Sequence, residues 1–149
     1  MNVGGHSVAI VALDEEDRVL LVRRFRHPGQ SLWGLPGGPL DRPGEQPREA
    51  ARRRLEAQTA LIATSWQRLL IMQPSPGDDG ERVHLFAATG LKVSAEPAGD
   101  GDDAIKEVLV VPVAEAIRLV AEGGIANGVP IAALLATRQW LAELDLAVR

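Results

Sequence analysis

The chain has 149 residues, of which 46% are hydrophobic and 24% are charged, and its formal net charge is −4. This balance is typical of a globular protein with a hydrophobic core, and it gives no general attraction to nucleic acid or to anionic membranes. The absence of cysteine excludes disulfides, thiolate metal ligands and cysteine nucleophiles. The sequence shows no signal-peptide pattern and no apolar stretch of membrane-spanning length, so a cytoplasmic location is expected.

Hydrophobic periodicity and turn residues predict strands and helices in alternation. Strands are predicted at 7–13, 18–24 and 32–35, within 61–73, at 82–89 and, as a strongly buried strand, at 106–111. Helices are predicted at 47–59, 114–121 and 131–144. The acidic, glycine-rich segment 95–103 is predicted to be a mobile loop. No repeat or domain boundary is visible, so residues 1–149 are expected to form a single domain.

The most informative segment is LPGGPLDRPGEQPREAARRRLEAQTAL, residues 35–61. Gly37 and Gly38 open a loop that reaches Glu45, and Arg53 follows after seven intervening residues. This segment resembles the signature of the Nudix hydrolase family, in which a Gly, a short loop, a Glu and seven residues precede Arg-Glu-apolar-x-Glu-Glu-x-Gly-apolar. The three helix glutamates of that signature fall here on Arg54, Ala57 and Gln58.

Further features resemble the ADP-ribose pyrophosphatase branch of the family. The loop from Gly38 to Glu45 is one residue longer than in the commonest form, and Phe25-Arg26-His27-Pro28 precedes Leu32-Trp33. The resemblance covers roughly residues 6 to 144. It implies an α/β Nudix fold, with a mixed β-sheet sandwiched between α-helices, and pyrophosphatase chemistry on nucleoside diphosphate derivatives. Members of this branch carry extra strands ahead of the first core strand, whereas this chain is expected to enter its first strand near His6.

The replaced glutamates bear directly on catalysis. Helix positions 54, 57 and 58 lie on one face, and glutamates there gather Mg²⁺ beside a diphosphate. A guanidinium, a methyl and an amide stand at these positions, and a divalent ion beside Arg54 would be repelled. We therefore expect weak or absent Mg²⁺-dependent hydrolysis and no metal cofactor.

A relocated Mg²⁺ site is the alternative to a lost one. It would combine Glu45 and Glu49, one helical turn apart, with a loop aspartate, the candidates being Asp100, Asp102 and Asp103. The simpler interpretation is that both glutamates favour the positive end of the helix dipole, that Glu49 pairs with Arg52 or Arg53, and that the loop aspartates are solvated.

Several residues are candidates for contact with a ligand. Arg53 and Arg54 can bind a phosphate directly, although an arginine-rich helix face is also typical of simple solvation. The glycines 37 and 38 permit close approach of a phosphate, as they also permit an ordinary turn. Trp33 can stack on a base, whereas core packing is the expected use of at least two of the chain's aromatic residues. Arg26 ends a strand that runs toward the cleft in the resembled fold, where it can contact an acidic ligand or serve only to keep an edge strand soluble. The three histidines, His6, His27 and His84, show no metal spacing and are interpreted as ordinary surface or strand residues.

Three functions remain in view from the sequence. The leading one is a Nudix-family protein that resembles ADP-ribose and nucleoside diphosphate-sugar pyrophosphatases, hydrolyses little or nothing, and binds a nucleotide or another phosphorylated small molecule. The second is an active hydrolase with a relocated metal site. The third is a structural or regulatory domain with a vestigial cleft. Apolar strand residues 108–111 and the Ala- and Leu-rich last helix favour a homodimer.

Overall fold

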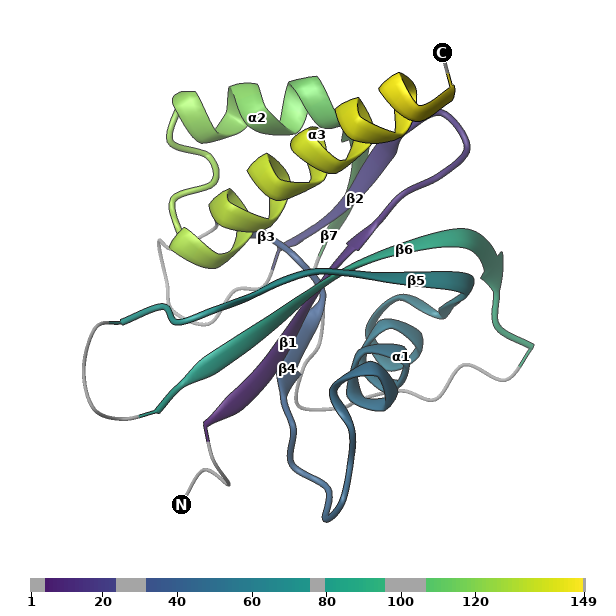
Figure 1. The fold of residues 1–149 in the computed structure, drawn as a ribbon, viewed down its shortest axis with the longest axis vertical. Helices are drawn as coiled ribbons and strands as arrows, with labels where there is room; N and C mark the ends of the chain where they lie inside the picture. Colours follow the sequence, from purple (N-terminus) through teal and green to yellow (C-terminus); the bar gives the residue numbers. More distant parts are fainter. Residues whose placement is uncertain (1–4, 24–31, 76–79, 96–106, 149) are drawn as a thin grey trace.

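The computed structural model describes residues 5–23, 32–75, 80–95 and 107–148, which form two sheets with helices on both sides (Figure 1). The elements in chain order are β1 (His6–Ala12), β2 (Arg18–Arg23), β3 (Trp33–Gly34), β4 (Gly37–Pro39), α1 (Pro47–Thr59), β5 (Leu61–Met72), β6 (Arg82–Val93), β7 (Glu107–Pro112), α2 (Val113–Ala121) and α3 (Gly128–Val148).

The larger sheet is mixed and has the strand order β4-β1-β6-β5. In it β1 runs parallel to β6, while β4 and β5 run antiparallel to their neighbours. The smaller sheet is antiparallel and has the order β3-β2-β7. Strands β1 and β2 are joined through an acidic turn, residues 14–17, where the Asp14 carboxylate accepts hydrogen bonds from the backbone N–H groups of Glu16 and Arg18, each at 2.9 Å.

The helices cover opposite faces of these sheets, with α1 on one side and α2 and α3 on the other (Figure 1). Side chains alternate along a strand, so β1 serves both faces. Ile10 is fully buried in the cluster beneath α1, and Val11 is fully buried in the cluster beneath α2 and α3. The expected architecture, a mixed sheet sandwiched between helices, is therefore confirmed.

Helix α1 was the most predictable helix, and the prediction of 47–59 matches its bounds. Helix α3 begins at Gly128, three residues earlier than predicted. Its first turn is closed by the Asn127 side chain, which accepts a hydrogen bond from the Val129 N–H at 3.2 Å, and Pro130 needs no donor in a first turn. None of the described helices has the length and apolar character needed to cross a membrane.

The prediction of a strongly buried strand at 106–111 was wrong in one respect. The strand β7 exists, but it lies at the edge of the smaller sheet, beside β2 alone among the described strands. Leu109 and Val111 pack against the core, whereas Val108 and Val110 remain 51% and 45% exposed. A continuous apolar run does not show whether both faces of a strand are covered, because that depends on its place in the sheet.

Candidate functional site

The paired glycines form a strand, β4, where the sequence suggested only a loop. Gly37 lies opposite Ala9 and Gly38 lies opposite Val8 on β1. A Cβ atom on Gly37 would stand 2.2 Å from the Val8 carbonyl oxygen, and the Gly37 φ of +155° is one that other residues rarely adopt. Gly37 is thus required for the close contact of β4 with β1, which is a structural reason for its presence.

Gln58 fastens α1 to this strand. Its side-chain oxygen accepts a hydrogen bond from the Gly37 N–H at 3.0 Å, and its side-chain nitrogen donates to the Gly37 carbonyl at 2.9 Å. Because the side-chain oxygen and nitrogen of Gln58 both bond to the backbone of Gly37, the oxygen that could otherwise bind a cation is already engaged. The sequence placed Gln58 on the correct helix face but gave no sign of this contact.

Arg54 lies beneath the start of the loop that follows β4. The residue is only 5% exposed, and it donates hydrogen bonds to the Pro39 carbonyl at 2.9 Å and to the Asp41 carboxylate at 3.1 Å. A Cβ atom on Gly38 would stand 2.9 Å from the guanidinium carbon of Arg54. Arg54 therefore fills the space beside Gly38 and holds the loop.

Arg53 holds the same loop from the outer side. It donates two hydrogen bonds to the Glu45 carboxylate, at 2.7 and 2.9 Å, and a third to the Asp41 carboxylate at 2.9 Å. These contacts with Arg53 hold the pKa of Glu45 below its ordinary value despite burial. Asp41, Glu45, Arg53 and Arg54 are hereafter called the arginine cluster.

The arginine cluster bears on the candidate metal site. Glu45, one proposed ligand, is engaged by Arg53, whereas Glu49, the residue expected to pair with an arginine, is exposed to solvent. No three acidic or histidine side chains within the described ranges lie close enough together to hold a metal ion. Asp100, Asp102 and Asp103 lie outside the described residues, so the relocated site stays a prediction.

The three signature positions on α1 do not fit Mg²⁺ as they stand. Position 54 carries a cation, position 57 carries a methyl, and the amide at position 58 is bound to Gly37. Hard divalent ions prefer several oxygen ligands, most of them carboxylates. The side chains of α1 at these positions supply none that is both anionic and available.

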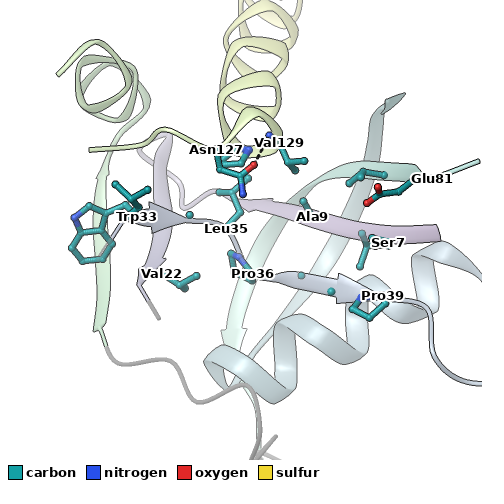
Figure 2. Close-up of a pocket in the computed structure, with 17 residues that line it drawn as sticks. Ser7, Ala9, Val22, Trp33, Leu35, Pro36, Pro39, Glu81, Asn127 and Val129 are labelled. Atoms are coloured by element: carbon teal, nitrogen blue, oxygen red, sulfur yellow. Dashed lines mark hydrogen bonds between the residues drawn. The ribbon is translucent and has the colours of Figure 1, made fainter. Parts of the chain in front are cut away.

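A hollow of about 560 Å³ lies on the other side of β1 from α1. Figure 2 shows it between β1, β4 and the first turn of α3, with Ser7 and Ala9 below Asn127 and Val129. Ala9 and Val129 pack in the cluster beneath α3, which places the hollow on that face. Its walls are mostly apolar side chains and strand backbone, with Ser7, Glu81 and Asn127 as its polar side chains.

Trp33, Gly37 and Gly38, three of the predicted ligand contacts, line this hollow. The Trp33 indole extends away from Ser7 and Pro39 (Figure 2), and the Arg23 guanidinium lies 4.6 Å from its ring centroid. The structure thus brings the glycines into contact with both the hollow and α1, while Arg53 and Arg54 lie on the α1 side. Arg26 lies outside the described residues.

A pair of histidines, of which His84 is buried and His6 is partly exposed, was missed by the sequence interpretation. His84 is 6% exposed, and its Nε2 lies 2.9 Å from Nδ1 of His6, with the two rings stacked. Burial, then the nearby charges of His6 and Arg68, hold the pKa of His84 below its ordinary value of 6.5. Residues 78 positions apart show no spacing signal, and only the parallel pairing of β1 with β6 brings them together.

Comparison with known proteins identifies the family. The NUDIX domain model matches residues 5–133. ADP-ribose pyrophosphatase from Mycobacterium tuberculosis is 39% identical over 131 residues, which cover 87% of this chain and 63% of that protein. Methanol dehydrogenase activator from Bacillus methanolicus is 31% identical over 117 residues, which cover 78% of this chain and 63% of that protein.

Solved structures share the fold. The structure described as an ADP compounds hydrolase matches with a TM-score of 0.78 at 23% identity, covering 93% of this chain and 74% of that one. The NUDIX domain of Shewanella oneidensis NrtR, complexed with ADP ribose, matches with a TM-score of 0.66 at 23% identity, covering 91% of this chain and 87% of that one.

This chain belongs to the Nudix family, near its ADP-ribose pyrophosphatase branch. The predicted family and branch are thereby confirmed. The chain spans 63% of the length of each of the two curated relatives described above.

Proposed function

We propose that this Nudix-family protein binds a nucleotide or another phosphorylated small molecule of the ADP-ribose class and hydrolyses it weakly or not at all. One observation carries the proposal: the three signature side chains of α1 are Arg54, Ala57 and Gln58, and the two polar ones are bonded to the β4 segment. An ion held there would meet a guanidinium in place of carboxylates, which disfavours the usual metal chemistry.

The kinds of relatives support the ligand class. They include ADP-ribose pyrophosphatases, GDP-mannose pyrophosphatases and a NUDIX domain whose structure was determined with ADP ribose. A nucleoside diphosphate with an attached sugar is common to these names. We extend this class of ligand to the present chain, with phosphate as the recognised group.

The first experiment measures binding and turnover together. Purified protein is titrated with ADP-ribose by calorimetry, once with EDTA and once with Mg²⁺, and product formation is followed by chromatography. We expect binding that is the same in both buffers and weakens with salt, and hydrolysis no faster than in buffer alone. Absence of binding in both buffers would overturn the proposal and favour a vestigial cleft.

A reversion experiment tests the metal argument directly. The triple change Arg54→Glu, Ala57→Glu and Gln58→Glu points three carboxylates from one helix face, so we expect it to raise Mg²⁺ affinity. The matched control is Arg138→Glu, Gln139→Glu and Ala142→Glu, which alters the same three residue types at exposed positions of α3. Equal Mg²⁺ affinity in the two variants would contradict the assignment of the signature positions.

The relocated metal site is the rival function, and the engagement of Glu45 by Arg53 counts against it. If the purified protein hydrolyses ADP-ribose with Mg²⁺ or Mn²⁺, the rival requires that Glu45→Gln or Glu49→Gln abolish the activity. Under the binding proposal, Arg54→Ala should produce no hydrolysis. It should weaken the metal-free binding of ADP-ribose by about 1.5–3 kcal/mol, the scale of a charged hydrogen bond.

We also propose a single domain over residues 1–149, a cytoplasmic location and a homodimer. The exposed apolar side chains of edge strand β7, Val108 and Val110, supply a surface that a second copy can cover. Light scattering at high micromolar concentration tests the dimer, and a monomeric mass there would end this part of the proposal.

A further inference from the structure

The carboxylate of Asp41 bridges two guanidinium groups. One of its oxygens accepts a hydrogen bond from a terminal nitrogen of Arg53 at 2.9 Å, and the other accepts one from a terminal nitrogen of Arg54 at 3.1 Å. Two oxygens on one central atom, each held by a different guanidinium, is also the arrangement in which arginines bind a phosphate group. The side chain of Asp41 therefore stands in a position that an oxyanion fits.

The two arginines are held independently of Asp41. Arg53 keeps its paired hydrogen bonds to Glu45, whose side chain is only 7% exposed, and Arg54 keeps its bond to the Pro39 carbonyl. Their own side chains are 17% and 6% exposed. Removal of the Asp41 carboxylate therefore leaves both terminal nitrogens oriented toward the same point.

Asp41 itself is free to move away. Its side chain is 56% exposed, and it belongs to a run of exposed residues, 41–44. The run is anchored at both ends, because the Leu40 N–H donates to the His6 carbonyl at 3.0 Å and Glu45 is fixed by Arg53. Because the carboxylate lies on the solvent side of the two more buried guanidinium groups, an anion of higher charge can reach them from solvent and compete for the same nitrogens.

We propose that Arg53 and Arg54 form a phosphate subsite that Asp41 occupies in this structure, and that a phosphate group of the ligand displaces the Asp41 carboxylate. The inference rests on the proposed function in taking a phosphorylated ligand, and it adds the location of the phosphate and the internal group that competes for it. The site requires no metal, because the two guanidinium groups supply the positive charge.

Inorganic pyrophosphate in EDTA is the probe, and its affinity is measured by calorimetry. Asp41→Asn removes the competing charge, and we expect pyrophosphate to bind about tenfold more tightly, the change expected on loss of one charge-assisted hydrogen bond. The matched control is Asp14→Asn, which removes the same charge from an exposed ion pair with Arg18 at the β1–β2 turn. The control should bind pyrophosphate as the unmodified protein does.

Two further variants complete the test. Asp41→Ser should give the same gain as Asp41→Asn, because the gain comes from the lost carboxylate and not from the new amide. Adding Arg54→Gln to Asp41→Asn should remove the gain, and thermal melting followed by circular dichroism shows whether each variant is folded. Equal affinities of the folded Asp41→Asn and Asp14→Asn variants would overturn the subsite.

The outcomes separate this inference from the proposed function. If ADP-ribose binds without metal and Asp41→Asn has no effect on pyrophosphate, the proposed function stands and the subsite is wrong. If Asp41→Asn tightens pyrophosphate but ADP-ribose does not bind to either protein, the subsite stands and the proposed ligand class is wrong.

Discussion

Two polar clusters are built into this fold by opposite means. In the arginine cluster, charges of both signs are brought together, and the pKa of Glu45 is lowered because its ionised form is bonded to Arg53. In the histidine pair, two rings meet, and the pKa of His84 is lowered because burial disfavours its charged form. The same direction of shift thus stabilises a charged acid in one place and a neutral base in the other.

The histidine pair also leaves one nitrogen unsatisfied. Nδ1 of His84 is buried without a hydrogen-bond partner among the described residues. A buried N–H without a partner costs more than a lone pair without one, so the neutral tautomer with the proton on Nε2 is favoured, and this nitrogen donates to Nδ1 of His6. The arginine cluster is thus held together by ion pairs, whereas the histidine pair is held by a hydrogen bond that requires one particular neutral tautomer of His84.

The largest expected effect is a loss of stability on substitution in strand β4, which leads into the loop of the arginine cluster. Gly37→Ala should destabilise the protein by about 3 kcal/mol or more, because the new Cβ meets backbone that is unable to yield. Gly34→Ala is the matched control, since a Cβ there has nothing within 4 Å. Chemical denaturation measures both, and equal losses would show that β4 does not approach β1 as described.

Glu45→Gln should come next, with a loss of about 2 kcal/mol, because a neutral amide replaces the carboxylate that accepts two bonds from Arg53. The control is Glu115→Gln, which removes an exposed carboxylate 2.7 Å from Arg118 and should cost less than about 0.5 kcal/mol. Urea midpoints of the two variants give the comparison. A similar small loss in both would mean that the charged cluster adds little stability.

Gln58→Ala should cost about 1–2 kcal/mol, the worth of two ordinary hydrogen bonds to Gly37 less the better helix propensity of alanine. Gln139→Ala on α3 is the control, because that glutamine is exposed and bonded only to Glu143 in the contacts described. Its stability should change little. Hydrogen exchange at the Gly37 amide should also accelerate in Gln58→Ala and stay unchanged in the control.

The smallest expected effect is a pH dependence that separates the two clusters. The folded pKa of His84 lies below 6.5, so the unfolded chain binds more protons as the pH falls below that value, and stability decreases. Glu45 contributes in the same direction only at pH values below its ordinary pKa of 4.5. Between pH 7.5 and 5.5, His84→Gln should therefore reduce the fall in melting temperature, and an equal fall in both proteins would contradict this assignment.

The sequence predicted the parts of the fold that depend on local pattern. Helix α1 follows from Pro47 and the buried Ala50, Ala51 and Leu55, and its bounds were correct. Exposure of Val108 and Val110 was missed, because it depends on which strands lie beside β7. The signature also aligned Arg54 and Gln58 with the helix positions at which the family signature has glutamates.

The side-chain contacts of the site could not be predicted from the sequence, because they too depend on tertiary structure. The bonds of Gln58 to Gly37 and of Arg53 to Glu45 depend on where the loop after β4 passes over α1. Charge pattern alone favoured Glu49 as the partner of an arginine, one turn away on the helix. The loop instead supplies the Glu45 carboxylate, which accepts two hydrogen bonds from Arg53, so tertiary geometry decided the pairing.

Strand β5 contains a register shift between Arg68 and Leu70. Arg68 lies opposite Phe86 but Leu70 lies opposite Leu85, so two steps on β5 match one on β6. Trp66 therefore packs beneath α1 and Met72 beneath α3, although both have even numbers. The extra residue reverses the alternation of side chains between the two faces of the sheet. Deletion of one residue between Arg68 and Leu70 would exchange the two faces of the strand beyond that point, so the side chains of residues 70–72 would each turn to the opposite side of the sheet.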